Sequence, residues 1–241
     1  MGKPIKKTDR KKAWFIRKTK KIEFESKSSE KTFLIICEGV NTEPLYFKSF
    51  PVQSIEIESY GLGMSKTSLV ENIHKIVQSK EKDADREVWC VFDMDVKYDE
   101  SITQKEDYNN AITLAQSYGY KVAYSNDCFE LWLVLHYQFV DGKMHRNQYY
   151  EILSKLWNCN YEKEGKKVSF SRQIYDRIEN DERANMTTAI KNSRKLLTNH
   201  ATLPFSNQNP CTTVYQLVCE LSEYMDGFDN ALNCKAIKEN S

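Results

Sequence analysis

Two continuous apolar segments, each followed at once by acidic residues, constrain the fold of this chain most strongly. The first segment is Thr32–Cys37, followed by Glu38; the second covers residues 87–92, followed by Asp93 and Asp95. Apolar segments without polar alternation are typical of strands that are buried on both faces of a parallel sheet. Open sheets of this kind carry their sites at the carboxyl ends of their strands, so these three acids are expected at one edge.

Strand-like and helix-like patterns alternate over more than half of the chain. Weaker strand patterns cover 54–60 and 121–125, and a helix is expected over 42–50, with Thr42 as its cap and Pro44 in its first turn. Alternation of this kind implies right-handed crossovers, so we predict an α/β fold with a largely parallel sheet flanked by helices. Further helices are expected at 68–79, 107–118 and 129–137.

The chain is expected to divide into three parts. These are a basic, mobile N-terminal arm over 1–30, an α/β core over 31–140 and a helical C-terminal extension over 141–241. The extension contains no strong strand pattern, and we expect it to shape a substrate groove or a partner surface. Its helical patterns cover 149–156, 171–177, 184–197 and 213–224.

Basic residues are concentrated in the N-terminal arm. Residues 1–21 carry ten Lys or Arg and one acid, Asp9, so the net charge of +1 conceals a strongly basic arm on an acidic body. Because Trp14 and Phe15 lie among the basic residues, the arm could contact phosphates and stack on nucleic-acid bases. The alternative is a solubilising tail, or one that docks on the acidic body of the same protein.

Several classes of protein are not expected. No apolar segment approaches the roughly 20 residues that cross a bilayer, so the expected location is the cytoplasm. The seven cysteines are odd in number and include no Cys-x-x-Cys pair, which indicates reduced core residues rather than disulfides or a zinc site. No Gly-x-Ser-x-Gly elbow is present, and residues 61–68 lack the Walker A glycine spacing, so neither a serine hydrolase nor ATP hydrolysis is expected.

The acids that follow the two strands indicate a metal site. Side chains alternate along an extended chain, so Asp93 and Asp95 are expected to point to the same side, near Glu38. Clustered carboxylates repel one another unless a cation neutralises them, and their hard oxygens suit Mg²⁺ or Mn²⁺. One or two such ions could polarise a phosphate and lower the pKa of an attacking water. The alternative is that these acids are merely solvated or cap helices.

Four further residues are candidates for the surroundings of this site. Glu130 could reach the metal, or it could close a capping-box-like helix start. Glu43 lies at the start of a helix, where negative charge is favourable, and could be a ligand or support one. Gly39 allows the backbone to approach a phosphate closely, and Lys66 could contact phosphate from a loop before a helix. His136 is about 240° around the helix from Glu130, so we expect it to be buried and hydrogen-bonded rather than catalytic.

Several motifs resemble those of a known family. Residues 36–39 (Ile-Cys-Glu-Gly) with 92–95 (Phe-Asp-Met-Asp) resemble the Toprim signature of topoisomerases, primases and the overcoming-lysogenization nucleases. More narrowly, the chain resembles the RloB-like proteins of bacterial phage-defence loci. The stretches that carry this resemblance are 37–47 (CEGVNTEPLYF), 91–95 (VFDMD) and 125–136 (SNDCFELWLVLH), with a weaker one at 209–215 (NPCTTVY).

The resemblance implies a Toprim-like fold and a Mg²⁺-dependent nuclease that acts in abortive infection or beside a restriction system, often with an ATPase partner. It implies that Glu38 is a general acid or base and a possible metal ligand, and that Asp93 and Asp95 are metal ligands. At Asp127 the family more often has proline, which should alter the turn before the next helix rather than the chemistry.

Three questions remain open at the level of sequence. The substrate could be DNA or a structured RNA such as tRNA. The chain could instead be a non-catalytic sensor that regulates an ATPase partner, although its intact carboxylates favour an enzyme. Primase-like nucleotidyl transfer would use the same acids, but it normally needs additional template-binding modules.

Overall fold

The computed structural model describes these stretches of the chain: residues 31–52, 55–59, 64–80, 86–95 and 102–225, of which 55–59 are described by their backbone. The basic arm expected over 1–30 lies outside the described residues, as does Cys234. Every described residue belongs to one compact unit, Lys31–Ser241.

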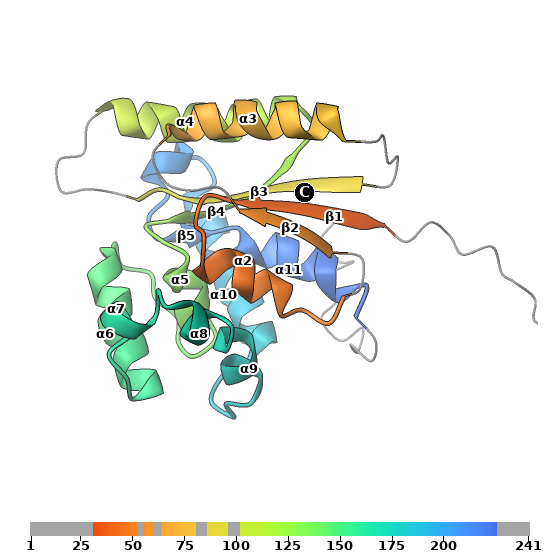
Figure 1. The fold of residues 1–241 in the computed structure, drawn as a ribbon. Helices are drawn as coiled ribbons and strands as arrows, with labels where there is room; N and C mark the ends of the chain where they lie inside the picture. The colour runs from red at the N-terminus through yellow and green to blue at the C-terminus, as the bar shows by residue number, and fades with distance from the viewer. Residues whose placement is uncertain (1–30, 53–54, 60–63, 81–85, 96–101, 226–241) are drawn as a thin grey trace, which may run out of the picture. The chain divides into compact units, whose positions relative to one another are not determined.

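A five-stranded sheet forms the centre of this unit, in the order β2-β1-β3-β4-β5 (Figure 1). The first four strands in this order are parallel, and β5 runs antiparallel to β4. The predicted α/β fold with a largely parallel sheet is confirmed. The strands are β1 (Thr32–Cys37), β2 (Ile55–Ser59), β3 (Arg86–Asp93), β4 (Lys121–Asn126) and β5 (Cys211–Thr212).

The last strand comes from the C-terminal region, where the sequence shows no strong strand pattern. Within β5, Thr212 pairs with Ser125 and Cys211 with Asn126, so residues far beyond 140 complete the sheet. A strand of two residues is too short to show an alternating pattern, which explains why it is not evident in the sequence.

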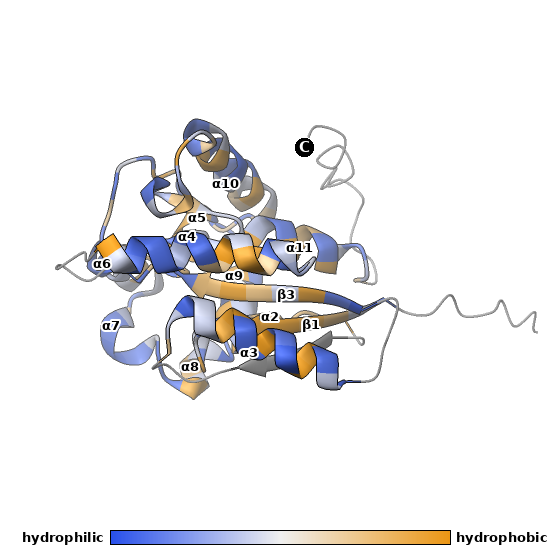
Figure 2. Cartoon of the chain, turned by 90° about the horizontal axis from the view of Figure 1, so that it is seen from above, coloured by the Kyte–Doolittle hydropathy of each residue, from blue (hydrophilic) through white to orange (hydrophobic). Residues whose placement is uncertain are grey.

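Helices cover both faces of the sheet (Figure 1). On one face α3 (Lys66–Ser79) and α4 (Ile102–Ser117) lie side by side, and Figure 2 shows hydrophilic and hydrophobic residues interspersed along both. Against the other face lie α2 (Thr42–Lys48), α5 (Glu130–Leu135), α10 (Met186–His200) and α11 (Val214–Ser222). The remaining helices are α6 (Arg146–Trp157), α7 (Tyr161–Glu164), α8 (Val168–Ser171), α9 (Ile174–Glu179) and the short 3₁₀ helix η2 (Phe205–Asn207).

The continuous apolar character of β1 follows from its two buried faces. Phe33 and Ile35 belong to the core beneath α2 and α5, whereas Leu34 belongs to the core beneath α3 and α4. All three side chains are fully buried, and burial of a side chain of this size contributes about 1.5–3 kcal/mol. The strand therefore has no solvent-facing side on which a polar residue would be favoured.

Several helix boundaries differ from those expected. Thr42 is the first residue of α2 rather than its cap: Asn41 precedes the helix and makes no side-chain capping bond, while Pro44 lies in the first turn as predicted. Helix α4 begins at Ile102 rather than near residue 107. The segment 171–177 is divided between the short helices α8 and α9.

Candidate active site at the carboxyl edge of the sheet

Backbone hydrogen bonds hold the segments that follow β1 and β3 against neighbouring strands. The Glu38 N–H donates to the Val91 carbonyl at 2.9 Å, which continues the pairing of β1 with β3 beyond the strand end. The Met94 N–H donates to the Ser125 carbonyl at 2.8 Å, which continues the pairing of β3 with β4. Glu38 and Asp93 therefore leave adjacent parallel strands at the same edge of the sheet, where the sequence places them.

Asp95 does not follow the expected alternation. β3 ends at Asp93, and the backbone at Asp95 is left-handed, with φ at 54°. The Asp95 N–H donates to the Asp127 carbonyl at 3.3 Å, and the Asp95 carboxylate forms an ion pair with Arg146. The side chain of Asp95 is thus directed by a turn and by its ion pair with Arg146, so strand alternation does not apply at this residue.

Asp93 binds the start of α5. Its Oδ2 accepts a hydrogen bond at 3.0 Å from the Phe129 N–H, just before the first helical residue. Burial is the largest cause that raises the pKa of Asp93 well above its usual range, and the charges of Glu43 and Glu130 raise it further. The Phe129 hydrogen bond and the charge of Arg146 oppose this rise. The environment of Asp93 is therefore both desolvated and negatively charged.

Glu130 is fully buried and is held by residues from the C-terminal region. Its Oε1 accepts hydrogen bonds from Lys166 Nζ at 3.0 Å and from the Tyr161 hydroxyl at 3.2 Å. Its Oε2 makes no hydrogen bond with the described residues. Burial favours the neutral form, but the charge and hydrogen bond of Lys166 outweigh burial and lower the pKa of Glu130. The Phe129 N–H that a capping box would use donates to Asp93 rather than to Glu130, and a role for Glu130 at a metal stays a prediction.

Glu43 is packed against Gly39. Its side chain is buried, and a Cβ added at Gly39 would lie 2.5 Å from Glu43 Oε2. Burial is the largest cause that raises the pKa of Glu43; Lys166 opposes it, and Glu130 and Glu38 add to it. The close approach expected at Gly39 is therefore made by a carboxylate of the same chain, and contact of Gly39 with a phosphate remains a prediction.

Lys66 is the first residue of α3 and reaches Glu38. Its Nζ lies 2.9 Å from Glu38 Oε1 and 3.1 Å from Oε2. Asp107 in α4 fixes the helix start, since its carboxylate accepts from the backbone N–H groups of Lys66 and Thr67 at 2.7 and 3.1 Å. Lys66, the candidate phosphate contact, thus forms a well-positioned ion pair with Glu38, the candidate general acid or base.

Among the residues that the structure describes, carboxylates outnumber cations at this edge. Glu38, Asp95 and Glu130 each have one cation, namely Lys66, Arg146 and Lys166. Within the described part of the chain, neither Glu43 nor Asp93 has a cation at ion-pair distance, although both are desolvated. A divalent cation would relieve this excess, and the donor oxygens are the hard ligands that Mg²⁺ or Mn²⁺ prefers. In the arrangement seen among the described residues, however, no three Asp, Glu, His or Cys side chains are grouped as a complete metal site.

Two of the residues that hold these acids are not evident in the sequence analysis. Arg146 and Lys166 come from the region beyond residue 140, and neither lies in a motif. Asn41 connects this region to the site, because its side-chain amide donates to the Lys166 carbonyl at 3.0 Å. The only signal in the sequence was the excess of acids, which requires cations from elsewhere in the fold.

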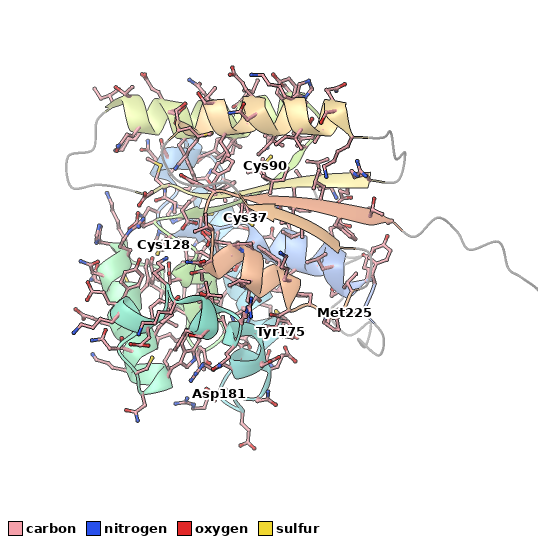
Figure 3. The ribbon with its side chains drawn as sticks, in the orientation of Figure 1. Cys37, Cys90, Cys128, Tyr175, Asp181 and Met225 are labelled. Carbon is pink, nitrogen blue, oxygen red and sulfur yellow. The ribbon has the colours of Figure 1, made fainter. Side chains whose placement is uncertain are left out.

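Nucleophilic alternatives find no support at this edge. Cys37 precedes Glu38, Cys128 lies just before α5, and both are labelled in Figure 3. Burial first, and then nearby carboxylates, raises the pKa of each thiol well above its usual range, so neither is a reactive thiolate. All described cysteines are free, as expected.

His136 is buried and hydrogen-bonded, as predicted. Its Nδ1 lies 2.9 Å from the Trp132 carbonyl oxygen, and burial lowers its pKa to about 4. The imidazole is therefore neutral near pH 7.

Among the described helices, none is both long enough and apolar enough to cross a bilayer.

A protein-family model described as RloB-like protein matches residues 33–221. The chain belongs to the RloB-like protein family. The matched region contains all the acids of the site and the three cations that hold them. No curated protein and no solved structure matches the chain.

Proposed function

We propose that this RloB-like protein is a Mg²⁺- or Mn²⁺-dependent nuclease that hydrolyses nucleic-acid phosphodiester bonds at the carboxyl edge of β1 and β3. One observation carries the proposal: Asp93 is desolvated among Glu43 and Glu130, at an edge where carboxylates exceed cations. Such an excess is costly in a purely structural ion-pair network, whereas a divalent cation would offset it. The resemblance of residues 36–39 and 92–95 to the Toprim signature points to the same chemistry.

The surroundings of each acidic side chain determine the role that we propose for it. Glu38, Asp93 and Asp95 would hold the metal, which when bound would polarise the scissile phosphate and lower the pKa of a water. Glu38 is also suited to proton transfer, since Lys66 contacts both of its oxygens and fixes their orientation. Glu43 and Glu130 lie deeper and would add negative charge behind the metal ligands.

Nucleic acid is the proposed substrate, with DNA and structured RNA such as tRNA both compatible with the site. Two lysines contact the acids and could bind the phosphate backbone: Lys66 begins α3, and Lys166 lies between α7 and α8. The biological part of the proposal is anti-phage defence by abortive infection, with an ATPase as the proposed partner. A plaque assay with wild type and Glu38→Gln tests it, because loss of protection with unchanged protein level would support an enzymatic role.

Cleavage of plasmid, single-stranded DNA and total tRNA, each with Mg²⁺, Mn²⁺ or EDTA, tests the biochemical part. We expect cleavage that EDTA abolishes and that Asp93→Asn or Glu38→Gln lowers on the order of a hundredfold or more. Glu87→Gln is the matched control, because Glu87 lies in β3 but near its opposite end. Full cleavage by Asp93→Asn would exclude this site, and a folded wild type that cleaves none of the three substrates would favour the sensor alternative.

A further inference from the structure

Arg146 contacts acids from two loops, those that follow β3 and β4. It is the first residue of α6, and its backbone N–H donates to Asp127 Oδ2 at 2.8 Å. Its guanidinium forms the ion pair with Asp95, and its Nε lies 3.8 Å from Asp127 Oδ2. Asp127 thus fixes the backbone of Arg146, while the guanidinium contacts Asp95, a candidate metal ligand.

We propose that Arg146 is a substrate-binding residue: its guanidinium neutralises Asp95 until a divalent cation takes this carboxylate, and it then binds a nonbridging oxygen of the substrate phosphodiester. This inference rests on the proposed nuclease function and names a further residue of the same site. A planar guanidinium can donate two parallel hydrogen bonds to a phosphate, which an ammonium cannot.

The contact between Arg146 and Asp95 leaves hydrogen-bonding capacity unused. Nη2 of Arg146 is buried and makes no aligned hydrogen bond with the described residues, although it touches Asp95 as an ion pair. A ligand oxygen in line with this N–H would make the hydrogen bond that Asp95 does not make, and would therefore be bound more tightly. The amino end of α6 also lies here, and the positive end of its dipole favours a bound anion.

Exposure distinguishes Arg146 from the other two cations of the site. The carboxylate that Arg146 would leave, Asp95, is 39% exposed, whereas the partner of Lys66 is 17% exposed and that of Lys166 is fully buried. Leaving a buried carboxylate unpaired is strongly destabilising, and leaving an exposed one is cheap. Of these three cations, Arg146 is therefore the one that can change partners at the lowest cost.

A purely structural ion pair makes the opposite prediction for metal affinity. If Arg146 only held Asp95 in position, its removal would weaken metal binding. If Arg146 competes with the metal for Asp95, its removal strengthens metal binding while nucleic-acid binding becomes weaker. Partner exchange therefore predicts that the two affinities change in opposite directions, and Arg146→Lys, which keeps the charge, separates this from a change in net charge alone.

The test uses full-length wild type, Arg146→Gln and Arg146→Lys, with Arg183→Gln as a control for loss of an exposed arginine paired with Asp181. Mn²⁺ affinity is measured by titration calorimetry. Binding of a fluorescent single-stranded oligonucleotide and of tRNA is measured in Ca²⁺, which replaces Mg²⁺ to slow cleavage. Circular dichroism checks the fold, and Arg146→Lys, which retains the charge, serves if Arg146→Gln does not fold.

We expect Arg146→Gln to bind Mn²⁺ about three- to tenfold more tightly and nucleic acid about tenfold more weakly. Arg146→Lys should bind Mn²⁺ like wild type but nucleic acid more weakly, since it lacks the planar fork. Unchanged or weaker Mn²⁺ binding by Arg146→Gln, or unchanged nucleic-acid binding, overturns the inference while the nuclease proposal stands. A wild type that binds no Mn²⁺ overturns both.

Discussion

The two ends of the parallel strands differ in the cations that pair with their acids. Near the amino end of β3, Glu87 lies 2.6 Å from Lys31 and 2.9 Å from Lys121, and both lysines also pair with Glu220, at 3.5 and 2.9 Å. Among the described residues, each of these two carboxylates pairs with the same two lysines, so two acids are matched by two cations. At the carboxyl end the acids exceed the cations among the described residues, and burial, followed by the charges of Glu43 and Glu130, raises the pKa of Asp93. The balanced cluster is suited to stability and the unbalanced one to binding a cation.

The buried pair of Glu130 and Lys166 offers the largest expected effect on stability. Lys166→Met should lower the free energy of unfolding by about 1–3 kcal/mol, because it leaves the fully buried Glu130 without a cation. The lower part of this range is favoured because Lys166 itself is about half exposed to screening solvent. Urea denaturation measures the change.

A second substitution identifies the cause of that loss. Glu130→Gln combined with Lys166→Met should recover most of the lost stability, because no unpaired charge remains in the core. A double variant no more stable than Lys166→Met would show that packing of the lysine stem, and not its charge, accounts for the loss.

The structure also shows how far sequence alone could predict this site. The positions of Glu38 and Asp93 follow from two apolar strands, because a segment buried on both faces is readily recognised. Arg146 and Lys166 lie beyond residue 140 on helices with no motif, so their approach to the acids depends on tertiary packing. The turn at Asp95 was equally hidden, since a left-handed residue after a strand leaves no periodic signal.

Asp93→Asn tests whether the carboxyl end is strained by its charges. The substitution should raise the free energy of unfolding by about 1 kcal/mol at pH 7, because an amide oxygen can still accept from Phe129 while the repulsion by Glu43 and Glu130 is removed. Thermal and urea unfolding without divalent cations measure the change.

The pH dependence of this gain has a definite sign. The pKa of Asp93 is raised in the folded state, so protonated Asp93 contributes its full share of stability at low pH. This contribution is lost as the pH rises through the folded-state pKa. The advantage of Asp93→Asn should therefore grow from pH 4 to pH 7. An advantage that shrinks over this interval would mean that the carboxylate is stabilising when ionised.

Neutralising an acid at the amino end should have the opposite sign. Glu87→Gln should lower the free energy of unfolding by about 1 kcal/mol, since Glu87 holds Lys31 and Lys121 and accepts from Trp89 Nε1 at 2.6 Å. This loss should diminish in high salt, which screens the lysines. If Glu87→Gln and Asp93→Asn shift stability in the same direction, the two ends of the sheet do not differ as inferred.

The smallest expected effect is at Gly39, which leaves room for the Glu43 carboxylate at the carboxyl end of the sheet. In Gly39→Ala the new Cβ would meet the Glu43 carboxylate, whose Oε2 lies 2.5 Å from the Cβ position. Since the end of a glutamate can move, we expect a loss of about 0.5–1 kcal/mol in unfolding free energy, together with weaker Mn²⁺ binding. Gly142→Ala is the control, because its Cβ would meet no atom within 4 Å, and the alanine should leave stability unchanged or slightly higher. Equal stability changes at the two positions would show that Glu43 is not held by Gly39, and the crowding of acids at this edge would then need another cause.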